Sequence, residues 1–381
     1  MKYIPLVQVC DFQGGSQPPK DQWIDHEKDG YIRMLQIRDF TQPDKDNVEY
    51  VCVSKTIKTC NEDDILIGRY GASVGKILTG LAGAYNVAII KTIPDTSKLS
   101  KRFLYHYLNS PYFQNYILSV GSRAAQAGFN KDDLSDAQIP DLSLEDQSNV
   151  VSQLDKVSEL ITLRKEQLAK LDQLVKSRFI ELFGDSNYHS EPLDNNVVEM
   201  FIGPFGSSLK NEVFVDEEDG FCMVYEQKHA IQKTMNVPTR YVPRSKYEEL
   251  KRFTILGGDI IVSCRGTIGE IFIVPDNAPM GIMHPSIMKI RLNTEKYNQK
   301  FFVFALEQYM DEHNAEAKGS GVKMAVSATV LGQSDFVVPP MEVQNQFAAF
   351  VEQTDKSKLA IQQSLDKLEL LKKSLMQEYF G

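Results

Sequence analysis

The sequence predicts an α+β protein in which two mixed α/β domains alternate with two long coiled-coil helices, in an internal pseudo-two-fold repeat. The segment DILIGRYGASVGKI at 64–77 recurs downstream as DIIVSCRGTIGEI at 259–271. The segment IPDLSLEDQ at 139–147 aligns with FVVPPMEVQ at 336–344, and this register continues without a gap to the last residue. Self-similarity at a fixed offset marks a duplicated architecture. We therefore divide the chain into two copies of a variable domain followed by a helix.

Composition is typical of a cytoplasmic protein large enough for two domains. No run of about 18 apolar residues exists, and the N-terminal residues lack the charged region and apolar core of a signal peptide. The five cysteines include no C-x-x-C pair, which favours reduced thiols in a cytosol over a structural zinc site. The net charge is −9 and no domain or helix is basic as a whole, so any DNA contact must use a local basic face.

The first variable domain comprises residues 1–141. Its runs DDILIGRYG at 63–71 and YNVAIIKTI at 85–93 are short, β-branched and close to glycine or polar residues, which predicts strands. The stretch KRFLYHYLNSPYFQNYIL at 101–118 has helical spacing. Its dense aromatic residues are most simply explained as part of the domain core.

The first long helix is predicted within residues 142–185, because no proline or glycine occurs at 149–183. Apolar side chains recur at steps of three and four, which is the spacing of a coiled-coil stripe. The stripe consists of Val150, Leu154, Val157, Ile161, Leu168, Leu171, Val175 and Leu182. Arg164 and Arg178 interrupt it.

The second variable domain, residues 186–338, repeats the same order of elements. GGDIIVSCRG at 257–266 and SIMKIRLN at 286–293 predict strands, and QKFFVFALEQYMDEH at 299–313 predicts a helix with core aromatic residues.

The second long helix, within residues 339–381, repeats the apolar stripe with complementary changes. Aliphatic residues stand where the first stripe has arginines, while Lys358 and Lys372 stand where it has aliphatic residues. Such changes are expected of helices that pack together. Gly184 and Gly381 follow the helices, where a left-handed C-cap belongs. We expect the helix-pair or partner interface to include Leu154, Ile161, Leu168, Leu171, Val351, Ile361, Leu365 and Leu368.

No catalytic constellation emerges from the sequence. The glycines of GASVGK at 71–76 are one residue too close for a P-loop, and Glu270 replaces the lysine in the second copy. Glu226 and Lys228 supply the second half of a nuclease motif, but no Pro-Asp precedes them at a suitable distance. The six histidines show no metal-ligand spacing. We expect neither a catalytic site nor a metal site in this chain.

Each variable domain has a glycine loop and a later polar loop that are candidates for DNA contact. Arg, Lys, Gln and Asn side chains read base edges in the major groove, while Ser, Thr and Lys commonly contact phosphates. The first domain supplies Arg69, Tyr70, Ser73, Lys76, Arg123, Gln126, Asn130 and Lys131. The second supplies Arg265, Thr267, Lys318, Lys323 and Ser327. A solvated turn is the alternative for each loop alone, but two similar loops on a repeated scaffold suit a ligand with repeated geometry.

In this order of elements, the chain resembles the specificity (S) subunit of type I restriction–modification systems. The resemblance rests on the two glycine loops, on the segments that lead into the helices, and on the helix ends KSRFIELFGD and KSLMQEYFG. It covers essentially the whole chain. The first segment departs from the family pattern by having Asp141 and Ser143 where prolines are common.

The resemblance implies that residues 1–141 and 186–338 are target recognition domains, each reading one half of a bipartite double-stranded DNA site. It implies that residues 142–185 and 339–381 are conserved spacer helices, packed antiparallel. It further implies two methyltransferase (M) subunits as partners, joined in the larger complex by restriction (R) subunits. S-adenosylmethionine, ATP and Mg then belong to those partners, and this chain has no cofactor of its own.

Two other functions stay open. One is the specificity module of a single-chain restriction–modification enzyme, which is disfavoured because this chain ends at Phe-Gly. The other is a non-catalytic coiled-coil scaffold that binds other proteins. DNA binding measured at rising salt would separate a scaffold from the DNA readers.

Overall fold

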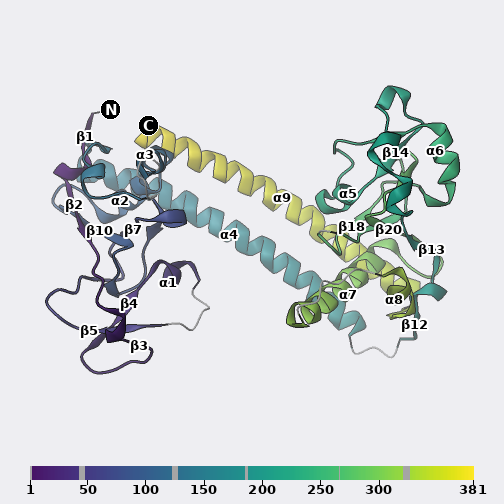
Figure 1. The fold of residues 1–381 in the computed structure, drawn as a ribbon, viewed down its shortest axis with the longest axis horizontal. Helices are drawn as coiled ribbons and strands as arrows, with labels where there is room; N and C mark the ends of the chain where they lie inside the picture. The colour runs from purple at the N-terminus through teal and green to yellow at the C-terminus, as the bar shows by residue number, and fades with distance from the viewer. Residues whose placement is uncertain (1, 43–47, 122–127, 185–187, 266, 321–326) are drawn as a thin grey trace. The chain divides into compact units, whose positions relative to one another are not determined.

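The computed structural model describes residues 2–42, 48–121, 128–184, 188–265, 267–320 and 327–381 (Figure 1). The chain forms two compact units. The first unit comprises Met1–Leu168 and Ala360–Gly381, and the second comprises Ala169–Leu359. The long helices α4 (Leu144–Phe183) and α9 (Met341–Phe380) contribute residues to both units. The predicted fold class, with two mixed α/β regions and two long helices, is confirmed.

The first unit contains a four-stranded antiparallel sheet with the order β2-β10-β7-β8. Its strands are β2 (Cys10–Gly14), β7 (Leu66–Gly68), β8 (Ile77–Leu78) and β10 (Ile89–Pro94). Ile67 of β7 lies opposite Ile90 of β10, and both side chains are buried. The β-branched runs predicted as strands are therefore the two central strands, where such side chains pack well.

A second sheet in the first unit contains one parallel pair of strands. The order is β3-β5-β4-β9-β6, formed by β3 (Trp23–Ile24), β4 (Tyr31–Leu35), β5 (Tyr50–Cys52), β6 (Thr59–Cys60) and β9 (Gly83–Tyr85). β4 and β9 run parallel, with Leu35 opposite Tyr85, and both of these side chains are fully buried. The carboxyl ends of β4 and β9 consequently lie at the same edge of the sheet, and α1 (Ile37–Thr41) begins there.

The second unit repeats both sheets. The order β13-β20-β17-β18 corresponds to β2-β10-β7-β8, and β15-β14-β19-β16 corresponds to β5-β4-β9-β6, again with a parallel central pair. The first of these sheets consists of β13 (Val197–Ile202), β17 (Ile260–Ser263), β18 (Ile271–Ile273) and β20 (Ile287–Leu292). The second consists of β14 (Cys222–Tyr225), β15 (Tyr241–Val242), β16 (Thr254–Ile255) and β19 (Gly281–Met283). The repeat read from the sequence is thus a repeat of topology.

A two-stranded ladder joins the two ends of each variable region. In the first unit, β1 (Tyr3–Pro5) pairs with β11 (Gln138–Pro140). In the second, β12 (Ser190–Pro192) pairs with β21 (Asp335–Val337). Each region therefore begins and ends at one place, next to the start of a long helix.

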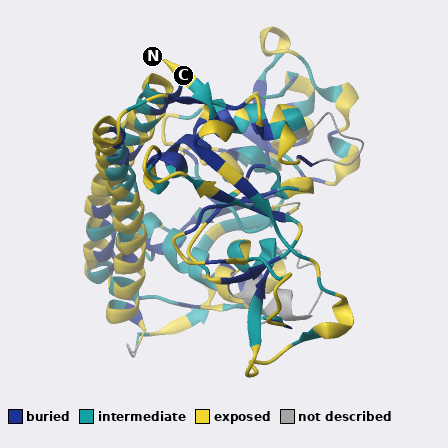
Figure 2. Cartoon of the chain, turned by 90° about the vertical axis from the view of Figure 1, so that its left-hand side faces the viewer, coloured by how far each residue is buried: buried dark blue, intermediate teal, exposed yellow. Residues whose placement is uncertain are grey.

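Aromatic helices cover the sheets and form the cores. The stretch predicted as one helix at 101–118 is two helices, α2 (Lys101–Leu108) and α3 (Pro111–Gly121). The Ser110 hydroxyl donates to the Tyr107 carbonyl at the end of α2, and Pro111, which has no amide hydrogen to donate, occupies the first position of α3. In the second unit α7 (Gln299–Ser320) is continuous. Phe103, Tyr107 and Phe301 are fully buried, which confirms the core assignment of the aromatic residues (Figure 2). The remaining short helices are α5 (Gln227–Gln232), α6 (Arg244–Glu249) and α8 (Ala328–Gln333).

The long helices are amphipathic, and the predicted stripe is their inner face. Leu154 is fully buried and Leu365 nearly so. The other predicted interface residues are partly buried: Ile161, Leu168, Leu171, Val351, Ile361 and Leu368. Gly381 has the expected left-handed backbone with φ of 100°. The same expectation for Gly184 is wrong, since its φ is not positive and its amide simply continues the helix by donating to the Ile180 carbonyl at 2.7 Å.

A buried glutamine fixes the start of each long helix. The Gln147 side chain accepts a hydrogen bond from Ser100 N at 2.9 Å and donates to the carbonyls of Lys98 and Leu142 at 2.7 and 3.0 Å. Gln344 makes the equivalent bonds, to Asn298 N at 2.8 Å and to the Lys296 and Pro339 carbonyls at 2.9 and 2.8 Å. The repeated glutamine of the sequence motif thus ties each helix to its own domain.

Candidate nucleic-acid interface

The repeated glycine loop is a tight turn between two strands. Gly75 and Gly269 have left-handed backbones with φ of 79° and 88°, a conformation that favours glycine. Gly75 N donates to the Gly68 carbonyl at 3.0 Å, and Gly269 N donates to the Ser263 carbonyl at 2.9 Å. The second repeated glycine of the motif is therefore required by the tight turn between the strands, which connects β7 with β8 in the first unit and β17 with β18 in the second.

In the first unit the glycine loop and the later polar loop lie side by side. Arg69 donates from Nε to the Phe129 carbonyl at 3.1 Å and from Nη1 to the Val87 carbonyl at 3.4 Å. Tyr70 forms an isolated bridge with Gly128, and its side chain is about half exposed. Arg69 therefore holds the second loop in place, and Tyr70 presents its ring at the surface.

The other predicted residues of the first unit are mostly at the surface. Lys76 is exposed, and Ser73 is half-buried. Asn130 caps the turn that follows it, since its Oδ1 accepts from the amides of Asp132 and Asp133 at 2.7 and 3.1 Å. Lys131 forms an ion pair with Asp11, and its hydrogen bond holds the pKa of that carboxyl below its usual range. Arg123 and Gln126 lie outside the described residues.

The predicted residues of the second unit are less closely grouped. Arg265 and Thr267 are exposed on the glycine loop. Ser327 caps the N-terminus of α8 through a hydrogen bond from Val330 N at 3.5 Å. Lys318 belongs to α7, but its side chain is outside the described part of the chain, as is all of Lys323.

A charged cluster that sequence analysis rejected as a nuclease motif lies at the edge of the parallel strands in the second unit. Glu226 follows β14 and is only 9 % exposed. Its carboxylate pairs with Arg240 and, at 2.7 Å, with Lys228 Nζ. Burial opposes the charged form, but these two cations hold the pKa of Glu226 below its usual range. Sequence reasoning missed the group because Arg240 is brought to Glu226 by strand pairing and not by a motif.

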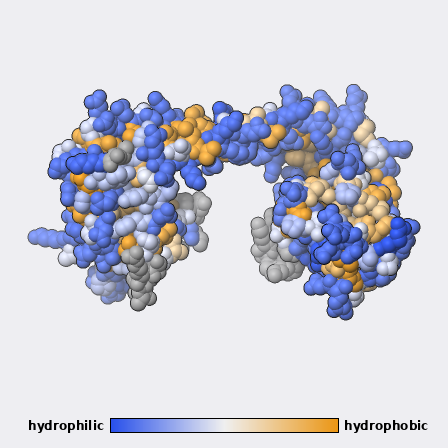
Figure 3. Space-filling model, turned by 90° about the horizontal axis from the view of Figure 1, so that it is seen from above, coloured by the Kyte–Doolittle hydropathy of each residue, from blue (hydrophilic) through white to orange (hydrophobic). Residues whose placement is uncertain are grey.

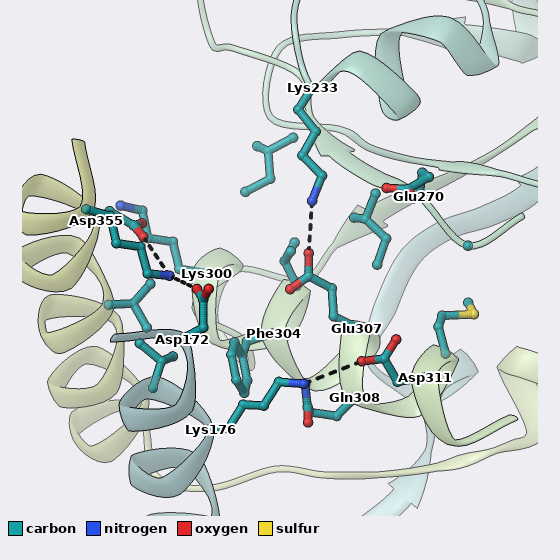
Figure 4. A pocket seen from close by; sticks show the side chains of 18 of the residues that line it. Asp172, Lys176, Lys233, Glu270, Lys300, Phe304, Glu307, Gln308, Asp311 and Asp355 are labelled. Carbon is teal, nitrogen blue, oxygen red and sulfur yellow. Dashed lines mark ion pairs between the residues drawn. The ribbon is translucent and has the colours of Figure 1, made fainter. Parts of the chain in front are cut away.

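A cleft of about 830 Å³ lies in the second unit between the glycine loop, α7 and the long helices (Figure 4). Its lysines are paired with carboxylates from other elements. Lys233 meets Glu307 at 3.5 Å, Lys176 meets Asp311 at 3.8 Å, and Lys358 meets Asp172 at 2.5 Å. These pairs tie the walls of the cleft together, and burial raises the pKa of Glu307.

The glycine loop of the first unit makes a different contact with the following helix. There the glycine loop packs directly on α3: Gln114 Nε2 donates to the Gly75 carbonyl at 2.9 Å. A Cβ atom at Gly75 would lie 2.8 Å from Ile117 Cγ2, so the contact also depends on glycine.

The outer faces of the long helices carry exposed leucine and isoleucine side chains. They include Leu160, Leu163, Leu174, Ile180, Leu359, Leu370 and Leu371. Figure 3 shows hydrophobic side chains interspersed with hydrophilic ones along these helices. Leu174 and Leu371 occupy equivalent positions in the two copies and are 49 % and 46 % exposed. Exposed apolar side chains that are scattered singly are normal on protein surfaces, so the feature that distinguishes Leu174 and Leu371 is their repetition in both copies.

Two further kinds of feature, a metal site and a membrane span, are absent from the described ranges. No group of three or more His, Cys, Asp or Glu side chains in these ranges is arranged to hold a metal ion. No helix there combines the length and the apolar character needed to cross a membrane.

Comparison with known proteins identifies a family. The model of the type I restriction modification DNA specificity domain matches residues 1–173 and 222–371. A protein of Methanocaldococcus jannaschii, named "Putative type I restriction enzyme MjaX specificity subunit", is 23 % identical over 372 residues, which cover 93 % of this chain and 83 % of that protein.

Two solved structures share the fold at 15 % sequence identity. One is a chain from a study of complex assembly and conformational transition of a type I R-M system, with a TM-score of 0.64, covering 100 % of this chain and 97 % of that chain. The other is the S subunit of a type I restriction-modification system from M. genitalium, with a TM-score of 0.54, covering 100 % and 96 %.

Proposed function

The chain belongs to the family of type I restriction–modification specificity subunits, whose role is DNA recognition, and we propose that each of its two units recognises one half of a bipartite double-stranded DNA site. The observation that carries this proposal is the repeated topology. Both units share the order of four strands in each sheet, with β3 as an additional edge strand in the first unit. The side chains on their glycine loops differ, with Lys76 in the first where the second has Glu270. A shared scaffold with different surface chemistry suits two half-sites of different sequence.

The long helices are proposed to bind two methyltransferase subunits. The equivalent exposed leucines, Leu174 and Leu371, support this because one apolar position is offered once per copy. A duplicated surface fits two copies of one partner. Restriction subunits join the same assembly in the larger complex.

We propose that the partner subunits catalyse the reactions of the complex. Methyl transfer, DNA translocation and cleavage use S-adenosylmethionine, ATP and Mg bound by the methyltransferase and restriction subunits. This chain supplies recognition, and we expect no methyl transfer to DNA by the purified chain alone.

Methylome sequencing of the host with and without this gene tests the proposal. We expect one motif with two specified halves and an unspecified spacer to lose its methylation when the gene is deleted. The scaffold alternative predicts an unchanged methylome. It also predicts that the assembled complex retains no duplex DNA at low salt, whereas a DNA reader binds and loses affinity steeply as salt rises.

A further inference from the structure

The polar cluster around Glu226 lies where two parallel strands end together. Glu226 directly follows β14, and His284 directly follows β19, the parallel partner of β14. His284 N donates to the Tyr225 carbonyl at 2.9 Å, which holds the two strand ends side by side. Polar side chains that follow the carboxyl ends of parallel strands share one edge of a sheet, a common location for ligand contacts.

Glu226 arranges the cations of this edge. Its carboxylate is largely buried, while the side chains of Lys228 and Arg240 that pair with it are 31 % and 33 % exposed. The Arg240 guanidinium also lies 3.9 Å from the ring centre of Phe214. Each of these two cationic side chains is therefore held by its ion pair with Glu226 while about a third of the side chain stays exposed to solvent.

The edge carries an excess of positive charge in a chain whose net charge is −9. The pKa of His284 is lowered, first by burial, and the charges acting on it are those of Glu226, Arg240, Arg265 and Lys228. Lys228 and Arg240 pair with one carboxylate, and Arg265 adds a third positive charge close enough to act on His284. A local cation excess on an acidic protein is the expected form of a phosphate-binding or base-reading surface.

The first unit has the same arrangement with different side chains. Gln36 follows β4 and Asn86 follows β9, the parallel partner strand. Here the carboxylate is Glu49, which accepts from Gln36 Nε2 at 2.7 Å and pairs with Arg38 and Lys20. A positive side chain at the third position after the strand, Arg38 after β4 or Lys228 after β14, is common to both units.

The backbone beside these strand ends is also the same in both units. A Cβ atom at Gly15 would lie 2.1 Å from the Asn86 carbonyl oxygen, and one at Gly203 would lie 2.3 Å from the His284 carbonyl oxygen. Both glycines are therefore required by an equivalent close approach of the chain. Constant backbone geometry with changed side chains is what two readers of different sequences need.

We propose that Lys228, Arg240 and His284, held in place by Glu226 and joined by Arg265, contact the DNA half-site bound by the second unit. This inference rests on the proposed function and assigns it residues. Arginine and lysine contact guanine edges and phosphates. His284 Nδ1 already meets Ser286, with Oγ at 2.8 Å and N at 3.2 Å, so we assign the DNA contact of this ring to Nε2. Glu226 is a positioning residue. In the first unit, the other half-site is contacted by the corresponding residues Arg38, Lys20 and Asn86.

The test uses the full chain assembled with its methyltransferase subunits and a DNA duplex carrying the motif that the wild-type complex methylates. Lys228→Ala and Arg240→Ala are compared with Lys296→Ala. Lys296 is the control because it belongs to the same unit, its side chain is 39 % exposed, and its Nζ pairs at 3.2 Å with Glu191 of β12. Lys228→Ala is decisive, because Arg240 still neutralises Glu226 in that variant and the fold is retained. Thermal unfolding of each complex verifies this.

We expect the two cluster variants to bind the duplex roughly 5- to 150-fold more weakly and to relax the methylated motif in one half only, as for lost base contacts. If the contact is to a phosphate, affinity falls for all sequences and the salt slope decreases by about one. Glu226→Gln should relax the same half-site, and Arg38→Ala the other one.

The proposal is overturned if folded complexes with Lys228→Ala and Arg240→Ala match Lys296→Ala in affinity, salt slope and motif. It is also overturned if Lys228→Ala and Arg38→Ala alter the same half-site. A wild-type complex that binds and methylates no DNA would contradict the proposed function itself, so the two failures are distinguishable.

Discussion

Gln147 and Gln344 are single residues on which the attachment of the helices depends. Each side chain is buried and satisfies three backbone groups, one amide and two carbonyls. Replacement by leucine keeps the size but leaves those buried groups without a partner, at about 1–3 kcal/mol for each group that water cannot reach. We expect Gln147→Leu and Gln344→Leu each to lower the free energy of unfolding by at least about 2 kcal/mol.

Gln173→Leu is the matched control for this prediction, since Gln173 is exposed on α4. Its effect on urea unfolding should stay within about 0.5 kcal/mol. Equal effects at buried and exposed glutamines would show that the motif is kept for a reason other than these hydrogen bonds.

His106 gives the first unit a pH-dependent stability. The ring is 2 % exposed, Nε2 lies 2.7 Å from Asp155 Oδ1, and Arg102 and Lys372 add positive charge nearby. Burial lowers the pKa of His106 below its usual 6.5, against the opposing influence of Asp155. A lowered pKa means that the folded protein resists protonation, so stability is full above pH 6.5 and is lost as the pH falls through the folded pKa.

The second copy has Phe304 at the place of His106, which supplies a natural substitution. We expect His106→Phe to remove part of the loss of stability between about pH 6.5 and pH 5. Chemical unfolding at several pH values measures this. Parallel pH profiles for the two proteins would contradict the assignment of the effect to His106.

Several roles of single residues could not be predicted from the sequence. Arg69 and Asn130 have side chains typical of base contacts, yet in the structure Arg69 donates to carbonyls of neighbouring loops and Asn130 accepts from amides of its own turn. An arginine or asparagine side chain can contact a DNA base or bind the protein backbone, and only the folded structure shows which of its atoms already have a hydrogen-bond partner. The pairing of Glu226 with Arg240 was equally hidden, because these residues meet only when β14 and β15 pair.

At the scale of elements, repeated and periodic segments were predicted well. The long helices and the strands β7, β10, β17 and β20 follow from periodicity and β-branching. The sheets built around β4–β9 and β14–β19 were not predicted, because their strands are short and pair across long stretches of sequence. The break between α2 and α3 was also missed, since the aromatic periodicity continues across Pro111.

The inner and outer faces of the helices should respond differently to the same substitution. Leu171 and Leu368 belong to the partly buried inner stripe. Glutamate there places a charge between packed helices, which typically costs several kcal/mol. We expect Leu171→Glu or Leu368→Glu to destabilise the helix pair, as measured by thermal unfolding, and to abolish co-purification with the methyltransferase subunit.

Leu174→Glu and Leu371→Glu are the matched outer-face changes, at side chains that are about half exposed. We expect unchanged thermal unfolding of the chain but loss of one methyltransferase subunit per variant, which native mass spectrometry would detect as a change in stoichiometry from 2:1 to 1:1. Full 2:1 assembly by both variants would exclude this face as the docking surface.

At the scale of the whole molecule, the repeat suggests that one variable region can replace the other. Each region begins and ends in its own two-stranded ladder, with Tyr3 opposite Pro140 in the first and Ser190 opposite Val337 in the second. A chain in which residues 3–141 replace residues 190–338 is therefore joined at matching positions. The Ser100 amide and the Lys98 carbonyl, which Gln147 binds in the first unit, would then be available to Gln344, which keeps its own bond to the Pro339 carbonyl.

The core beneath the transplanted region must be matched as well. Phe103 lies 5.3 Å from Phe380 between ring centres, as Phe301 lies 4.7 Å from Phe183, so this contact is kept. Other positions differ: the second unit has the larger Phe347 where the first has valine, and Phe179 where the first has methionine. Overpacking of this kind costs about 1–3 kcal/mol. The exchange should therefore include Phe347→Val and Phe179→Met.

We expect this exchanged chain, assembled with its methyltransferase subunits, to methylate a symmetric motif in which the half-site of the first unit occurs twice, in inverted orientation. The reason is that the pseudo-two-fold repeat would then carry identical readers. Methylome sequencing of a host that expresses the exchanged chain would reveal the motif, and the wild-type chain serves as the reference. A folded, active exchanged complex that retains the original asymmetric motif would refute the assignment of one half-site to each unit, because the second reader would then lie outside residues 190–338.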